Sequence, residues 1–141
     1  MQTFLPYPDF RKSLECLDNK RLGKQRVESS TLLKTLTEGG GWSNHPATRM
    51  WKGYENSLRD YFNISVQIWV SRGFKNTYEF LDFDPLTTQD DPPWVGNEAF
   101  HASHRSNLLR KDPLFYGKYG WSEPPTLPYI WPAKLQNNPA T

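Results

Sequence analysis

The residue with the clearest capacity for chemistry is Glu28, a carboxylate in a stretch that is rich in basic residues. On a helix with about 100° per residue, Arg21, Gln25 and Glu28 share one border of an apolar stripe, and Lys24 lies just outside it. A carboxylate between apolar and cationic surfaces can move protons or stabilise a developing cation. The alternative is ordinary helix electrostatics, because a Lys24–Glu28 pair at i,i+4 contributes only about 0.3 kcal/mol. The spacing alone leaves both interpretations open.

A second group of candidates lies towards the end of the chain, where His101, His104, Arg105 and Lys111 fall within one predicted helix. The two histidines have the spacing of metal ligands, but no acid or cysteine completes a site at a diagnostic distance. We therefore expect no metal and no other cofactor. The histidines are expected to be hydrogen-bonded or to lie near phosphate, and the two basic side chains to contact phosphate.

The segment that follows, KDPLFYGKYGW, interleaves aromatic rings with lysines and glycines. This pattern suits a loop that meets a phosphodiester and its bases. It suits equally a C-terminal segment that packs over the helices. The two interpretations are compatible, with Tyr116 and Lys118 facing a ligand and Trp131 facing the core.

The elements that must position these residues are predicted to be helices. Asp9, Asp18 and Asn97 are N-caps, and the pair His45-Pro46 opens a further helix. Breakers then bound four helices, at about 9–17, 18–37, 46–72 and 97–111. His45 itself is counted among the residues that face nucleic acid, and so is Arg26, on the border of the second helix opposite Glu28.

The expected fold is all-α, a compact bundle of about three to four helices. An extended N-terminal segment precedes them, and an aromatic, proline-rich C-terminal tail follows. Residues 1–141 are expected to form one domain, with 75–96 as an acidic surface excursion and 133–141 as a flexible tail. No strand pair, repeat or low-complexity tract is evident.

Composition bounds the function. The net charge is only +2, so a nucleic-acid site must come from local clustering of basic residues. Most of the six Trp are expected to fill the core, and a minority to stack on bases. The single cysteine, Cys16, cannot form an intramolecular disulfide. No apolar run approaches the length of a membrane span, so we expect a cytoplasmic protein without membrane contact. A monomer is the default expectation.

The order of these pieces resembles a known family. LDNKRLGKQRVES, HPATRMWKGYENSL, SRGF, NEAFHASHRSNLLRK and FYGKYG, which together extend from Leu17 to Gly120, are similar to the bacteriophage-type pyrimidine-dimer DNA glycosylases, also called phage endonuclease V. The pieces HPA-x-RMW-x-GY and YIWP are closer still to a little-characterised bacterial branch of that family.

The resemblance implies a compact helical fold with the N-terminal segment lying across the helices. It also implies base excision followed by strand cleavage on duplex DNA that carries a lesion or a modified base. In this family an N-terminal α-amine attacks the sugar C1′ and forms an imine, and a helix glutamate assists. Glu28 matches that glutamate, and Arg21 falls where the family has a histidine that contacts DNA. Lys111 matches a basic position in the last helix, and Phe115 and Tyr116 fall at the aromatic pair of the tail.

Departures from the family pattern leave alternatives open. Val27 and Thr31 stand where the family has arginines, and Gln2 stands where it has a threonine exposed by removal of methionine. Since a glutamine blocks the usual removal, Met1 becomes the candidate nucleophile together with Gln2. A non-catalytic nucleic-acid-binding module, or a glycosidic-bond hydrolase that acts on nucleotides or RNA, are the competing functions.

Overall fold

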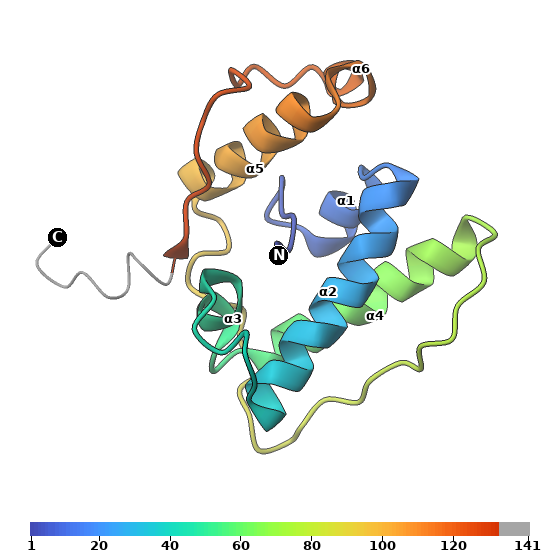
Figure 1. Cartoon of the computed structure of the whole chain (residues 1–141), viewed down its shortest axis with the longest axis vertical. Coiled ribbons are helices and arrows are strands. Elements are labelled where there is room, and N and C mark those ends of the chain that lie inside the picture. Colours follow the sequence, from blue (N-terminus) through green and yellow to red (C-terminus); the bar gives the residue numbers. More distant parts are fainter. Residues whose placement is uncertain (133–141) are drawn as a thin grey trace, which may run out of the picture.

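The computed structural model describes residues 1–132, and the tail expected to be flexible, 133–141, lies outside them. The described chain contains helices, turns and extended segments but no strand, which confirms the all-α prediction (Figure 1). Its elements are α1 (Phe10–Glu15), α2 (Asn19–Glu38), α3 (Pro46–Trp51), α4 (Glu55–Ser71), α5 (Glu98–Lys111), α6 (Pro113–Tyr116) and the 3-10 turn η1 (Gly117–Tyr119).

The helices begin at the capping residues that the sequence indicates. The side chain of Asp9 accepts a hydrogen bond from Lys12 N at 2.8 Å, and that of Asn97 accepts one from Phe100 N at 3.1 Å. Asp18 caps α2 in the same way, with a longer bond to Arg21 N. Each cap satisfies an amide that the first helical turn leaves without a partner.

The prediction of a single helix over 46–72 is wrong, because this stretch forms two helices, α3 and α4. Gly53 adopts φ 89°, a left-handed conformation that glycine tolerates without a steric penalty. Tyr54 N then donates to Trp51 O at 2.8 Å, which closes a turn between the two helices. The break and the short α6 explain why residues 1–132 contain six α-helices in place of the three to four expected.

The core lies where α2 crosses α4, and Figure 1 shows the two helices packed against each other. Leu22 and Leu32 of α2 are fully buried, as are Leu58 and Tyr61 of α4. α5 lies on the other side of the N-terminal segment and faces the same core through Leu108. The helices thus leave a passage between α2 and α5 that residues 2–6 fill.

Residues 2–6 are buried and extended, and side chains of the helices satisfy their backbone groups. Phe4 N donates to Gln25 Oε1 of α2 at 2.7 Å, and Tyr61 OH of α4 donates to Phe4 O at 2.9 Å. The two backbone groups of Leu5 bond to histidines of α5. Buried backbone groups need such partners, and here helix side chains supply what a neighbouring strand would supply in a sheet.

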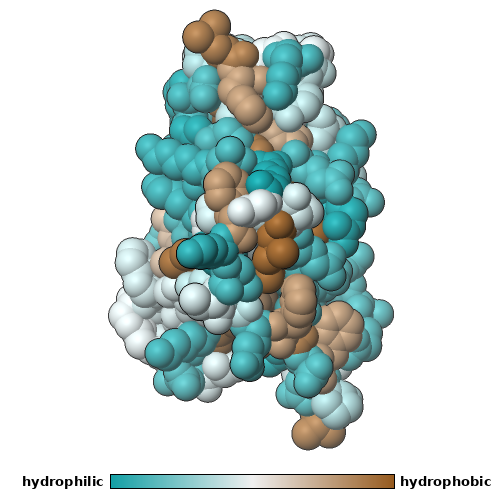
Figure 2. Space-filling view, turned by 90° about the vertical axis from the view of Figure 1, so that its right-hand side faces the viewer, coloured by the Kyte–Doolittle hydropathy of each residue, from teal (hydrophilic) through white to brown (hydrophobic). Residues whose placement is uncertain are grey.

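The segment 75–96 contains no helix and runs along α4, where Leu81 N donates to Asn63 Oδ1 at 2.8 Å. The C-terminal end of this segment packs into the core, because Trp94 is buried against Trp51 with ring centroids 4.9 Å apart. Figure 2 shows a largely hydrophilic face with apolar residues in small groups. None of the described helices has the length and apolar composition that crossing a bilayer requires.

Candidate active site

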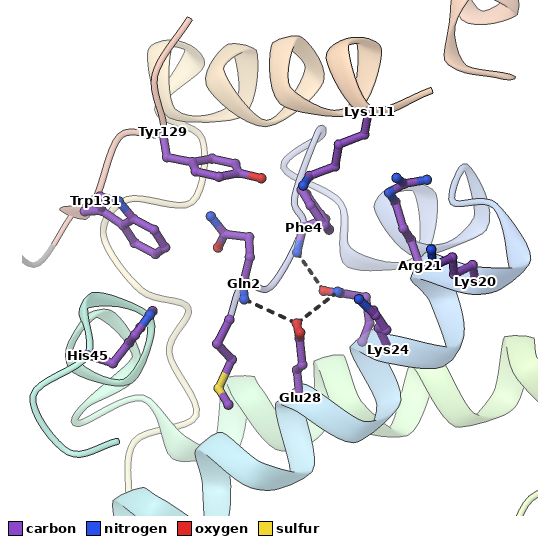
Figure 3. A pocket seen from close by; sticks show the side chains of 12 residues that line it. Gln2, Phe4, Lys20, Arg21, Lys24, Glu28, His45, Lys111, Tyr129 and Trp131 are labelled. Carbon is purple, nitrogen blue, oxygen red and sulfur yellow. Dashed lines mark hydrogen bonds between the residues drawn. The ribbon is translucent and has the colours of Figure 1, made fainter. Parts of the chain in front are cut away.

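A pocket opens where the N-terminal segment emerges between α2, α5 and the start of α3, with a volume of about 490 Å³. Figure 3 shows the side chains that point into it from these elements and from the C-terminal segment, residues 121–132. The lining residues are Met1, Gln2, Phe4, Lys20, Arg21, Lys24, Gln25, Glu28, His45, Lys111, Tyr129 and Trp131.

Glu28 lies on the floor of this pocket, one peptide unit from the α-amine of the chain. Gln2 N donates a hydrogen bond to Glu28 Oε2 at 3.2 Å (Figure 3). Gln25, one turn earlier on α2, turns its Nε2 towards the same oxygen at 3.5 Å. The carboxylate is therefore oriented by two neutral donors rather than by a cation, which leaves its charge free to act on a ligand.

The α-amine of Met1 belongs to the same electrostatic environment. Burial lowers the pKa of His45, the positive charge of the Met1 amine lowers it further, and the Glu28 carboxylate opposes both. His45 Nδ1 accepts a hydrogen bond from Ala47 N at 3.0 Å, so the ring caps α3 as a neutral imidazole that carries its proton on Nε2. Amine, imidazole and carboxylate thus meet in one pocket.

Four basic side chains occupy the opposite side of the pocket: Lys20, Arg21, Lys24 and Lys111. Arg21 pairs with Asp18 at 3.2 Å, whereas within residues 1–132 the three lysines form no ion pair. The pKa of Lys111 is lowered by burial and by the positive charges of Arg21, Arg110 and Lys24, and Glu28 raises it. Clustered cations that repel one another favour the arrival of an anion such as a phosphodiester.

Arg26, which the sequence also proposes for phosphate, lies outside this pocket. Its guanidinium stacks over Trp69 at 4.6 Å from the ring centroid, and its Nη1 donates to Asn76 Oδ1 at 2.8 Å. It is thus engaged in fixing the segment after α4. Of Lys24 and Arg26, the basic residues closest to the positions of the missing family arginines, only Lys24 lines the pocket, and neither Val27 nor Thr31 lines it.

His101, His104 and Arg105 are interior residues: the histidines are hydrogen-bonded, the first of the two alternatives, and the phosphate contact expected of Arg105 does not fit its burial. Both histidines are fully buried and bond to the backbone of Leu5. Arg105 is 8% exposed, donates to Pro6 O at 2.8 Å and pairs with Glu98 and Glu123. A helical wheel of α5 does not reveal this, because the N-terminal segment and the C-terminal segment cover two of its faces.

The roles expected for the two tail aromatics are exchanged. Tyr116 is fully buried and its hydroxyl bonds to Asp18 at the start of α2, so it does not face a ligand. Trp131 is half-buried and lines the pocket. Lys118 is exposed but outside the pocket, with its Nζ 3.9 Å from the ring centroid of Phe115.

Four lining residues were missed by sequence reasoning: Phe4, Lys20, Tyr129 and Trp131. Lys20 lies one turn before Lys24 on α2, so the basic run contained a signal for it. For Tyr129 and Trp131 no local signal existed, since their segment returns to the pocket only by packing on α5. Burial raises the pKa of Tyr129 to about 12, which keeps its hydroxyl protonated as a donor.

The arrangement combines a carboxylate, an amine and a cationic wall. A carboxylate beside an amine can accept its protons and stabilise a neighbouring cationic centre. A cationic wall positions phosphates without reading sequence. These groups suit a reaction at a sugar carbon of a polynucleotide, in which positive charge develops close to flanking phosphates.

Comparison with known proteins agrees with this chemistry. A family model described as pyrimidine dimer DNA glycosylase matches residues 1–82, which include the N-terminal segment, α2 and Glu28. No curated protein and no solved structure matches the chain. Since the match covers more than half of the sequence, the chain belongs to the pyrimidine dimer DNA glycosylase family.

Proposed function

We propose that the protein is a DNA glycosylase with abasic-site lyase activity, which acts on duplex DNA that carries a damaged or modified base. The observation that carries the proposal is the hydrogen bond of 3.2 Å between Gln2 N and Glu28 Oε2 in the cationic pocket. It holds the start of the chain against the one carboxylate among the lining residues. The α-amine of Met1 acts as nucleophile, and Glu28 moves protons.

The proposed reaction proceeds in two balanced stages. The neutral amine forms a bond to the sugar C1′, and the glycosidic bond breaks as the base leaves with the electron pair and takes up a proton. The attached nitrogen loses one proton, its lone pair then opens the sugar ring as O4′ takes up a proton, and a protonated imine results. Removal of a proton from C2′ expels the 3′ phosphate, with the protonated imine accepting the electrons, and water finally hydrolyses the imine and frees the amine. Glu28 stabilises the cationic sugar and carries protons in both stages.

The surrounding residues supply binding and geometry for this reaction. Lys24 and Lys111, which line the pocket, hold the phosphates on either side of the reacting sugar. Gln25 fixes both Phe4 and Glu28, so that the amine and the carboxylate keep one relative position. Extruding a nucleotide from the duplex costs about a few kcal/mol and least at a lesion, which favours damaged sites.

The test is trapping with borohydride on a duplex that contains an abasic site. Reduction of the imine gives a stable amine, and peptide mapping by mass spectrometry is expected to find the adduct on Met1. The same spectra report whether Met1 is retained. An adduct on Lys24 or Lys111 would assign the nucleophile to a side chain, and DNA binding with neither adduct nor cleavage would identify a non-catalytic module.

Two variants sharpen this test. Glu28→Gln is expected to lower strand cleavage by about 100-fold or more while duplex binding changes little. Glu38→Gln removes a carboxylate at the far end of the same helix and is the matched control, with cleavage like that of the wild type. An uncleaved extension at the N-terminus converts the Met1 amine into an amide and is expected to abolish trapping. The same extension at the C-terminus is expected to leave trapping intact.

A further inference from the structure

The C-terminal segment forms a wall of the pocket, although it lies beyond the residues that the family model matches. It is bound to α5 through small polar side chains: Leu127 N donates to Ser106 Oγ at 2.9 Å, and Ile130 N donates to Ser103 Oγ at 3.2 Å. Tyr129 lies between these two bonds and Trp131 directly follows the second. The bonds thus hold both side chains on the pocket side of the segment (Figure 3).

The rings on this wall form a connected aromatic cluster. Tyr129 and Trp131 have ring centroids 5.7 Å apart, and Trp131 meets His45, the N-cap of α3, edge-on at 5.9 Å. Phe4 touches Tyr129 from below, with centroids 6.3 Å apart. Tyr129, Trp131 and His45 are only half-buried, so part of each ring surface remains accessible. Ring surface of this kind binds nucleobases, because every base offers a π-face for stacking.

One polar group on this side has no partner. Gln2 is 6% exposed, and its amide rises towards Tyr129 rather than towards Glu28 (Figure 3). Gln2 Oε1 accepts from Thr3 N at 2.9 Å, which assigns the other amide atom as Nε2. Within the described chain this buried Nε2 has no hydrogen-bond acceptor. A ligand in the pocket that offers an acceptor would satisfy this donor.

The pocket is therefore divided by chemistry. Cations line the side of α2 and α5, aromatic rings line the side of the C-terminal segment, and Glu28 lies between them. A nucleotide placed with its sugar over Glu28 would have its phosphates on the first side and its base on the second.

We infer that Tyr129, Trp131 and Gln2 form a nucleobase subsite, which holds the base of the reacting nucleotide. The rings stack on the base, and Gln2 Nε2 donates to a carbonyl oxygen or ring nitrogen on its edge. The inference rests on the proposed function for the position of the sugar. It adds the residues that select the base, which the match to the family does not assign.

Photocrosslinking tests the subsite without requiring turnover. A duplex that carries 5-iododeoxyuridine opposite guanine offers a readily extruded base whose photochemistry reports contact with aromatic rings. With the Glu28→Gln protein bound, we expect crosslinked peptides that contain Tyr129 or Trp131. The yield is expected to fall in Trp131→Leu and Tyr129→Leu but not in Phe83→Leu, which removes an exposed ring outside the pocket. Crosslinks confined to other residues, with the duplex shown to be bound, would overturn the inference.

Kinetics separates base recognition from a merely structural role. Trp131→Leu is expected to slow excision from a pyrimidine-dimer duplex about tenfold or more, since stacking contributes to binding of the base. Cleavage of a preformed abasic duplex, which has no base at the reacting sugar, is expected to stay within twofold of the wild type. An equal fall in both rates would overturn the subsite. Failure of the wild-type protein to form an abasic-site adduct would instead overturn the proposed function. The crosslinking result does not depend on that adduct and would still report whether the rings contact the base.

Discussion

Leu5 is bound by His104, because its backbone N–H donates a hydrogen bond of 2.8 Å to Nδ1 of that imidazole. The carbonyl of Leu5 accepts a second bond of 2.7 Å from Nδ1 of His101, whose Nε2 accepts from Gly96 N. Both rings must be neutral for this pattern, since each uses one nitrogen as an acceptor. Burial lowers the pKa of His101, and it lowers the pKa of His104 to about 3. The position of the N-terminal segment therefore depends on two uncharged histidines.

Acidification should destabilise the protein through His104. Its pKa is lower in the folded chain than the ordinary 6.5, so between those values the unfolded chain binds one proton more. Stability is complete above about pH 6.5 and falls by roughly 1.4 kcal/mol per pH unit below it. Urea unfolding at pH 7.5, 6 and 5 measures this. His104→Gln should be less stable at pH 7.5 but show a shallower slope, and equal slopes for the two proteins would contradict the assignment.

The fold was largely predictable because its boundaries are local. Asp9, Asp18 and Asn97 bond to amides within three residues, and these short-range bonds are visible in the sequence. The break at Gly53 was not predictable, because apolar residues continue at helical spacing on both sides of it. A glycine inside such a pattern does not reveal whether it will adopt a positive φ, since tertiary packing decides that.

The candidate site was predictable only where it lies on one helix. Arg21, Lys24 and Glu28 share a face of α2, so their common position in the pocket follows from helical spacing. Burial of His104 depends on a segment 99 residues away, and a wheel does not show which face such a segment covers. The same holds for Trp131, which reaches the pocket only after the chain has turned back along α5.

Gln25 should prove necessary for both stability and cleavage. Its Oε1 accepts from Phe4 N at 2.7 Å, and Tyr61 OH shares its one proton between this oxygen, at 2.7 Å, and Phe4 O, at 2.9 Å, in the interior. Gln25→Leu leaves the buried Phe4 N–H without a partner, which costs about 1–3 kcal/mol, and it releases the segment that Glu28 holds. Urea unfolding and abasic-site cleavage, compared with Tyr61→Phe, measure the two effects. Tyr61→Phe keeps the bond from Phe4 and should have the smaller effect on cleavage.

Tyr116 should act on stability rather than on DNA binding. Its hydroxyl bonds to the side chain of Asp18 and accepts from Asp18 N at 3.1 Å. Burial raises the pKa of Asp18, but the hydrogen bonds from Tyr116 and Arg21 outweigh it and lower the pKa. Tyr116→Phe is expected to reduce the free energy of unfolding by about 1–3 kcal/mol. Duplex affinity, measured by anisotropy at a temperature where the variant is folded, should change less than twofold; a larger loss would indicate direct contact.

The lysines of the pocket should set the salt dependence of DNA binding. Lys24 and Lys111 form no ion pair within the described chain, so both are available to phosphates. Each phosphate contact contributes about −0.9 to the slope of log affinity against log salt. Lys24→Ala and Lys111→Ala should therefore each make that slope shallower by about one, with weaker binding at low salt. Lys34→Ala removes an exposed lysine of α2 outside the pocket and should leave the slope unchanged. Equal changes in all three variants would show that binding follows total charge, not contacts in the pocket.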